Sequence, residues 1–234
     1  MSALAELDEA VSGCRRCPRL VEWREHVAAT KRAAFASETY WGRPVPGFGP
    51  DGAALAIVGL APAAHGGNRT GRMFTGDRSG DVLFQALYDV GLASQPQSTR
   101  LGDGLELRGT RITAPVHCAP PDNKPTPGER DECRPWLVRE LELLRPTLRA
   151  VVVLGAFGWQ ALLPVLDAVW PVPKPRPKFG HGAEIVLPGN PGLSVFGCFH
   201  PSQQNTFTGR LTPAMLREVL SRAADVAGLG RAAV

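Results

Sequence analysis

The chain has 234 residues, of which 44% are hydrophobic and 21% are charged, a balance that fits one sizeable core and excludes an intrinsically disordered protein. The formal net charge of +4 permits a polyanionic partner without requiring one. Five cysteines, an acidic N-terminus without a secretory signal and only short apolar runs argue against a disulfide framework and against membrane insertion. We therefore expect a cytoplasmic protein with reduced thiols.

Apolar runs and helical periodicities alternate along most of the chain. Strands are expected at 54–58, 111–116, 150–154, 184–187 and 193–199. Helices are expected at 3–11, 82–90, 135–144, 157–169 and from Thr212 onward, whereas 22–52 is interpreted as irregular. Strands separated by helices predict a doubly wound α/β domain with a mainly parallel sheet.

Three loops follow predicted strands and are rich in glycine, proline, asparagine and basic residues. They are 59–72, 117–125 and 200–205. Ligands bind beyond the carboxyl ends of the strands in such sheets, so these loops predict the active site. The first loop lacks the Gly-Lys-Ser/Thr ending of a P-loop and is not one.

Four cysteines form two pairs, Cys14 with Cys17 and Cys118 with Cys133. Four thiolates suit either zinc or an iron–sulfur cluster, and spacing alone does not choose between them; separate buried thiols are the plain alternative. Cys198 lies inside an apolar run and is interpreted as a core residue.

Four other residues each have a structural and a functional interpretation. Phe74 is either core or a surface for a planar ring, and Asp77 is either the cap of the following helix or a catalytic residue. For Asn123, the structural interpretation is an Asx-turn after Asp122. His200 follows a predicted strand and is either part of a turn or an anion stabiliser.

Taken together, the cysteines and four short motifs resemble the uracil-DNA glycosylase superfamily over residues 14–220. The motifs are 59–63 (GLAPA), 71–76 (GRMFTG), 120–124 (PPDNK) and 200–202 (HPS). Of the iron–sulfur branches, family 4 carries an acidic residue where Leu60 stands, a glycine at Ala63 and an asparagine at Thr113. The chain is therefore similar to family 5.

This resemblance implies a single three-layer α/β/α domain over 1–234 with a central, mainly parallel four-stranded sheet. It implies a monofunctional glycosylase that flips and excises uracil, and other deaminated bases such as hypoxanthine, from DNA. Asn123 would hold the attacking water, Asp77 would assist the water or the sugar cation, and His200 would donate toward the departing base. Phe74 would stack on the base, and Gly59, Leu60 and Ala61 would line its pocket.

The resemblance also implies a DNA surface and a cofactor. Residues 200–210 resemble a loop that wedges into the minor groove. Expected DNA contacts are Arg69, Arg72, Lys124, Gln203, Gln204, Asn205 and Arg210. The segments 14–17 and 118–133 would hold a structural [4Fe-4S] cluster through Cys14, Cys17, Cys118 and Cys133.

We expect a monomer whose partner is DNA containing deaminated bases. Two rival classes stay open at this stage: a non-catalytic nucleic-acid-binding module with a structural metal, and an enzyme that acts on free nucleosides.

Overall fold

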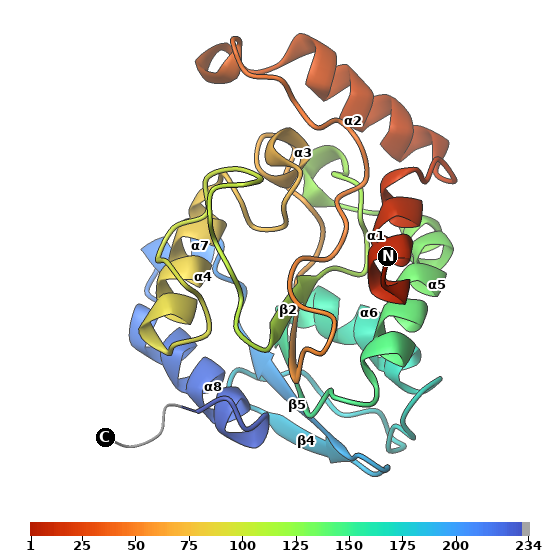
Figure 1. Cartoon of the computed structure of the whole chain (residues 1–234), viewed down its shortest axis with the longest axis vertical. Coiled ribbons are helices and arrows are strands. Elements are labelled where there is room, and N and C mark those ends of the chain that lie inside the picture. Colours follow the sequence, from red (N-terminus) through yellow and green to blue (C-terminus); the bar gives the residue numbers. More distant parts are fainter. Residues whose placement is uncertain (231–234) are drawn as a thin grey trace.

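A five-stranded sheet crosses the centre of the computed structural model, which describes residues 1–230 (Figure 1). The strand order is β2-β1-β3-β5-β4, and every neighbouring pair is parallel except β4 with β5. The strands are β1 (Leu55–Val58), β2 (Thr110–Thr113), β3 (Ala150–Leu154), β4 (Glu184–Leu187) and β5 (Leu193–Cys198). The α/β class is confirmed, but the sheet has five strands rather than four because β4 adds an antiparallel edge.

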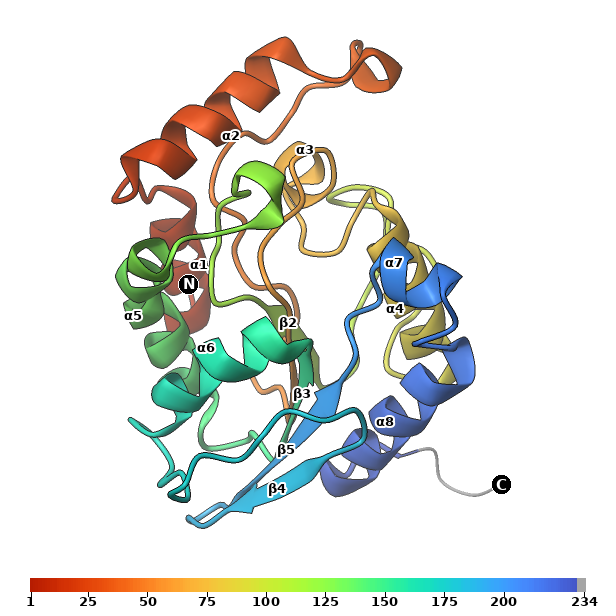
Figure 2. The ribbon, with the colours of Figure 1, turned by 180° about the vertical axis from the view of Figure 1, so that it is seen from behind.

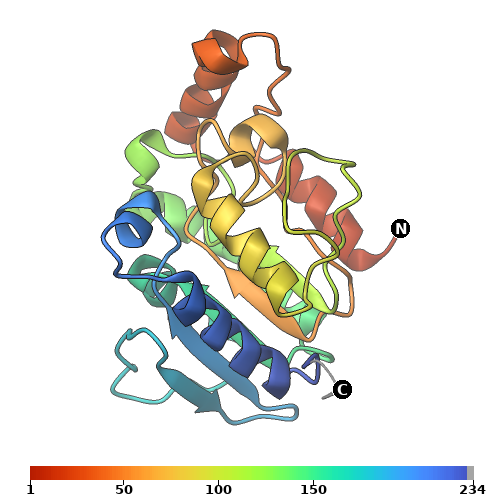
Figure 3. The same ribbon diagram turned by 90° about the vertical axis from the view of Figure 1, so that its left-hand side faces the viewer.

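Helices cover both faces of this sheet. Seen from behind, α1, α5 and α6 lie on one side of it and α4 and α8 on the other (Figure 2), and Figure 3 shows α4 and α8 side by side over their face. These helices are α1 (Ala3–Ser12), α4 (Arg78–Asp89), α5 (Pro127–Leu144), α6 (Ala156–Leu166) and α8 (Pro213–Val226). The predicted three-layer arrangement is therefore present.

Strand β1 explains why a continuous apolar run is needed in the middle of the sheet. Successive side chains of a strand point to opposite faces. Leu55 and Ile57 pack into the core beneath α4 and α8, whereas Ala56 and Val58 pack into the core beneath α1, α5 and α6. A strand with helices on both faces has no solvent side, so alternation with polar residues is lost.

The shorter elements gather at the carboxyl end of the sheet. They are α2 (Pro18–Thr30), η1 (Ala33–Phe35), α3 (Gly67–Thr70), η2 (Pro121–Asn123) and α7 (Gln203–Phe207). In Figures 1 and 2, α2 crosses above α3 and away from the sheet. Within residues 1–230 there is no helix with the length and apolar character that crossing a membrane requires.

Two expectations about helices were wrong. The segment after residue 22 is not irregular: α2 runs to Thr30, and its buried stripe of Leu20, Arg24 and Val27 includes an arginine, which hides the helical period. Helix α5 begins at Pro127 instead of 135, behind a capping box in which Thr126 and Glu129 bond each other's backbone.

Candidate functional site

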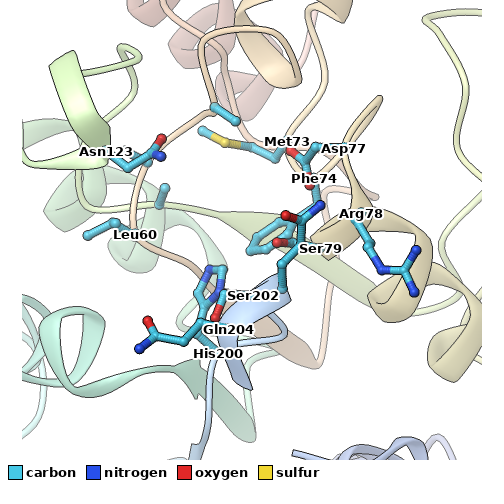
Figure 4. Close-up of a pocket in the computed structure, with 14 residues that line it drawn as sticks. Leu60, Met73, Phe74, Asp77, Arg78, Ser79, Asn123, His200, Ser202 and Gln204 are labelled. Carbon is cyan, nitrogen blue, oxygen red and sulfur yellow. The ribbon is translucent and has the colours of Figure 1, made fainter. Parts of the chain in front are cut away.

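A cavity of about 490 Å³ opens at the carboxyl end of the sheet, where the three predicted loops meet. Leu60, Phe74, Asp77, Asn123 and His200 all contribute to its wall. Figure 4 shows Asn123 on the opposite side of the cavity from Asp77, with His200 and Phe74 beside each other. The predicted catalytic and base-binding residues are thus brought to one place; Gly59 lies at its edge, beneath the Phe74 ring.

Phe74 is fixed by glycines in an uncommon backbone conformation. Its φ is 53°, a left-handed value that a bulky residue rarely adopts. A Cβ at Gly59 would lie 2.7 Å from the Phe74 ring, and a Cβ at Gly80 would lie 1.7 Å from the Phe74 carbonyl oxygen. The ring therefore rests against the backbone that follows β1, 5.8 Å from the imidazole of His200 between ring centres.

Asp77 is both a helix cap and a wall of the cavity. Its Oδ1 accepts a hydrogen bond of 3.1 Å from the backbone N–H of Gly80, which caps α4. A Cβ at Gly66 would lie 2.3 Å from Oδ2, so only glycine lets the carboxyl sit there. Burial raises the pKa of Asp77 more than the hydrogen bonds from Gly80 and Ser79 lower it. The structural and functional interpretations of Asp77 are therefore compatible.

His200 is an uncharged donor or acceptor at neutral pH. Burial lowers the pKa of its imidazole to about 4. Its main chain is held by Asn205, whose Nδ2 donates to the His200 carbonyl oxygen at 2.8 Å. Asn205 thus has a local structural role, which the sequence prediction of a DNA contact did not include.

Asn123 stands at the end of η2 with a φ of 54°. Asparagine tolerates this left-handed conformation better than most residues. Its side chain makes no hydrogen bond to any other group in residues 1–230 and is exposed. A free amide on the cavity wall offers both donors and an acceptor to a ligand or a water molecule.

Two of the arginines expected to contact phosphate are held inside the protein instead. Arg72 is 3% exposed and pairs with Asp103 at 2.8 Å. Arg69 pairs with Glu38 and donates to the carbonyl oxygens of His65 and Gly76. Their charges are satisfied within the fold, where they brace the loop between β1 and α4, and their contact with DNA stays a prediction.

The remaining predicted contacts lie at the surface around the cavity. Lys124, Gln203, Gln204 and Arg210 are exposed, and the two glutamines line the cavity. Arg78 also lines it and was not singled out from the sequence, although its place directly after a predicted helix cap was the available signal.

The four paired cysteines line one small, mainly apolar pocket beside α2 and α5. Burial raises the pKa of Cys118 to about 11 and that of Cys133 to about 12. Within the described residues, no three His, Cys, Asp or Glu side chains are grouped closely enough to hold a single metal ion. Cys198 lies elsewhere, fully buried in the core as predicted.

A buried arginine beside the cysteines indicates whether an anionic group fits this pocket. Arg24 lies on its wall, and its Nη1 is 2.9 Å from the Sγ of Cys118. Its nearest carboxylate in the described chain, Glu25, is 3.9 Å away and exposed. A buried charge is stable only when it is paired. An anionic cluster bound by the four thiolates would supply that pair, so the residues of this pocket fit such a group.

The chain matches the family model described as the uracil DNA glycosylase superfamily over residues 46–224. It therefore belongs to that superfamily, a class of hydrolases acting on N-glycosyl bonds.

Within the superfamily, the chain is 55% identical to the type-5 uracil-DNA glycosylase of Mycobacterium leprae, over 97% of each chain. It is 50% identical to the type-5 uracil-DNA glycosylase of Thermus thermophilus, over 94% of this chain and 97% of that one. Identity to the type-4 uracil-DNA glycosylase of Pyrobaculum aerophilum is 30%, over 70% of this chain and 66% of that one. The expectation of family 5 is confirmed.

Proposed function

We propose that this protein is a monofunctional DNA glycosylase that hydrolyses the N-glycosidic bond of uracil, and of other deaminated bases such as hypoxanthine, in DNA. It leaves an abasic site, the starting point of base excision repair, and acts as a monomer in the cytoplasm. The observation that carries this proposal is the convergence of Asp77, Asn123 and His200 on one cavity that also presents an aromatic ring.

The chemistry requires two charges to be stabilised and one water to be aimed. Breaking the bond leaves positive charge on the sugar and negative charge on the base. The buried Asp77 carboxyl faces the sugar or the attacking water, and the free amide of Asn123 holds that water. Neutral His200 donates a ring N–H to the departing base, while Phe74 stacks on it.

Burial prepares His200 for this role. An imidazole with a pKa of about 4 binds as a neutral group at pH 7, so it brings no cation that would attract stray anions. The hydrogen bond strengthens as negative charge develops on the base, which stabilises the transition state more than the ground state.

The cavity wall favours tolerance among bases. Leu60, Ala61 and Ala114 present apolar surface. Thr113, at the place where family 4 carries an asparagine, is buried and donates to Glu140 at 2.6 Å, away from the cavity. A base edge that lies against this apolar part of the wall makes no hydrogen bonds there, so a base with a different edge loses none at that place. This supports excision of hypoxanthine as well as uracil.

Cys14, Cys17, Cys118 and Cys133 would hold a [4Fe-4S] cluster, which supplies a structural cross-link and no step of the hydrolysis. Cys17 is the cap residue of α2, and Cys133 lies within α5. The cluster would therefore fix α2 against the body of the protein, with Arg24 as its counter-charge.

Incubation with a duplex containing uracil opposite guanine tests the proposal. We expect free base and alkali-labile sites, with the backbone intact before alkali treatment. Parallel duplexes with hypoxanthine test the wider specificity. A brown, iron-containing sample that binds DNA but releases no base would instead identify a non-catalytic binding module, and release from free nucleosides alone would identify the third class.

A further inference from the structure

A second hollow, of about 430 Å³, adjoins the catalytic cavity on the side of α2. The two share part of their walls, including Ala63, Arg78 and Asn123. A polymer that leaves the catalytic cavity on this side therefore enters the second hollow directly. We call this hollow the flanking groove; apart from Asp77 and Asn123, which it shares with the cavity, its residues have no part in the chemistry proposed above.

Aromatic rings form the far wall of the flanking groove. Trp23 comes from α2 and Phe35 from η1. The guanidinium of Arg69 stacks on the Phe35 ring, with its Cζ 3.9 Å from the ring centre. Through this contact, Arg69 fixes the Phe35 ring beside the cavity.

Trp23 carries an unsatisfied polar atom. Its Nε1 is buried and has no hydrogen-bond partner within the part of the chain that the structure describes. A buried N–H without an acceptor costs free energy, which a bound acceptor recovers. The indole also lines a further hollow on the side of Arg19 and Pro121, so it stands between two open spaces rather than in the core.

The charge of the flanking groove favours an anionic chain. Arg32 and Arg78 line it, and neither forms an ion pair with any described carboxylate; the Arg78 guanidinium lies over the exposed Phe207 ring, with its Cζ 4.7 Å from the ring centre. Both arginines are exposed at the surface. The acidic groups that face it are Asp122 at the rim and the buried Asp77, which already accepts backbone hydrogen bonds.

We propose that the flanking groove binds the nucleotide next to the excised one on the same strand when that nucleotide is unpaired. Its base stacks on Trp23, and its phosphate lies between Arg32 and Arg78. This inference rests on the proposed glycosylase function and deepens it, because it names a substrate preference. Aromatic platforms beside basic side chains are the usual means of holding single-stranded nucleic acid.

The preference follows from what a paired neighbour does. A base that stays in the duplex is stacked and hydrogen-bonded there, so it gains nothing from Trp23. An unpaired neighbour, in a single strand or beside a mismatch, is free to enter the groove. The protein should therefore process damaged bases faster where the adjacent base is unpaired.

The test combines protein variants with substrates. Single-turnover excision is measured on a single strand, on a fully paired duplex with uracil opposite guanine, and on duplexes with one further mismatch 5′ or 3′ of the uracil. We expect the wild type to favour the single strand and one of the two mismatched duplexes. Trp23→Ala should lower those two rates on the order of ten-fold and leave the paired duplex nearly unchanged.

Two further variants and one binding measurement complete the design. Trp23→Phe should keep most of the preference, Arg32→Ala should weaken it and make it less salt-dependent, and Tyr88→Ala, an exposed aromatic change on α4, should leave it intact. Fluorescence anisotropy with an undamaged single strand should show about ten-fold weaker binding by Trp23→Ala.

Equal loss on all substrates, or unchanged preference and binding in Trp23→Ala, would overturn the groove assignment. A wild type that binds the undamaged strand through Trp23 but excises no base would overturn the glycosylase proposal instead, so the two failures are distinguishable.

Discussion

The proposed catalytic cavity and the cysteine pocket share one stretch of chain, but burial has opposite consequences for charge in the two sites. After β2, the chain contributes Cys118 to the cysteine pocket, then Asn123 to the cavity, then Cys133 to the cysteine pocket again. In the cavity, burial drives Asp77 and His200 toward their neutral forms. In the cysteine pocket, burial surrounds a permanently charged arginine. In the proposed function, the cavity would stabilise charges that appear during the reaction, whereas the cysteine pocket surrounds the charge of Arg24 at all times.

The largest effect is expected from Asn123→Ala. Loss of the amide removes the group that aims the water, and a lost contact to a developing charge typically costs roughly 10²–10³-fold in rate. Single-turnover excision should fall by that factor, whereas DNA affinity and iron content stay close to wild type. The comparison of the two sites predicts this separation, because Asn123 contacts neither cysteine pair.

Gln204→Ala, on the same cavity but outside the proposed catalytic group, is the matched control and should lower the rate only a few-fold. An Asn123→Ala protein that loses its iron together with its activity would show that the two sites are not separable.

A second, smaller effect is expected from Arg24→Met, which addresses the cysteine pocket alone. With the cluster bound, the substitution removes a charge-assisted hydrogen bond to Cys118 and should lower the unfolding free energy by about 2 kcal/mol. Without iron, it removes a buried charge whose carboxylate partner, Glu25, is exposed and 3.9 Å away, and should be neutral or stabilising. Denaturant unfolding of iron-loaded and iron-free samples measures both, with absorbance near ~400 nm following the cluster.

Arg15→Met is the matched control, since Arg15 lies in the same segment but forms an exposed pair with Glu25. Its effect on the unfolding free energy should be small in either state, because solvent screens an exposed ion pair. If Arg24→Met destabilised the iron-free protein as strongly as the loaded one, Arg24 would be a packing residue and not a counter-charge.

The sequence predicted the sheet and the cavity better than it predicted the region around α2. Strand runs such as 54–58 carry a signal that depends only on burial, and loops after parallel strands must meet at one edge. Helix α2 was not predicted because its buried face contains Arg24. The burial of this arginine follows from its place in the cysteine pocket and not from helical periodicity.

The charged residues show a similar limit. Sequence alone does not distinguish an arginine at the surface from one paired inside. Arg72 meets Asp103, 31 positions away along the chain, and Arg69 meets Phe35 across a similar separation. Such partners follow from the tertiary fold, as does the exposure of Arg78. Arg69 and Arg72 are therefore engaged within the fold, whereas the contact of the exposed Lys124 and Arg210 with DNA stays a prediction.

The smallest effect on stability is expected from Asp77, where two substitutions separate the capping role from the proposed catalytic role. Asp77→Ala loses the cap of α4 and should lower the unfolding free energy by about 1 kcal/mol, whereas Asp77→Asn keeps a capping oxygen. Burial raises the pKa of Asp77 in the folded protein above its ordinary value of 3.8. Ionisation of Asp77 therefore destabilises the fold as the pH rises from 3.8 through this raised pKa. Asp77→Asn does not ionise, so its stability relative to wild type should increase from about pH 4 toward neutrality and remain higher there.

Thermal unfolding of both variants over that pH range measures this, together with excision at neutral pH. Both should be slow enzymes, since either change removes the carboxylate that faces the sugar. An Asp77→Asn protein that is less stable than wild type at neutral pH would mean that the carboxylate stabilises its surroundings. The cavity would then resemble the cysteine pocket, because both would stabilise a charge that is present before any reaction, and the two sites would not differ in this respect.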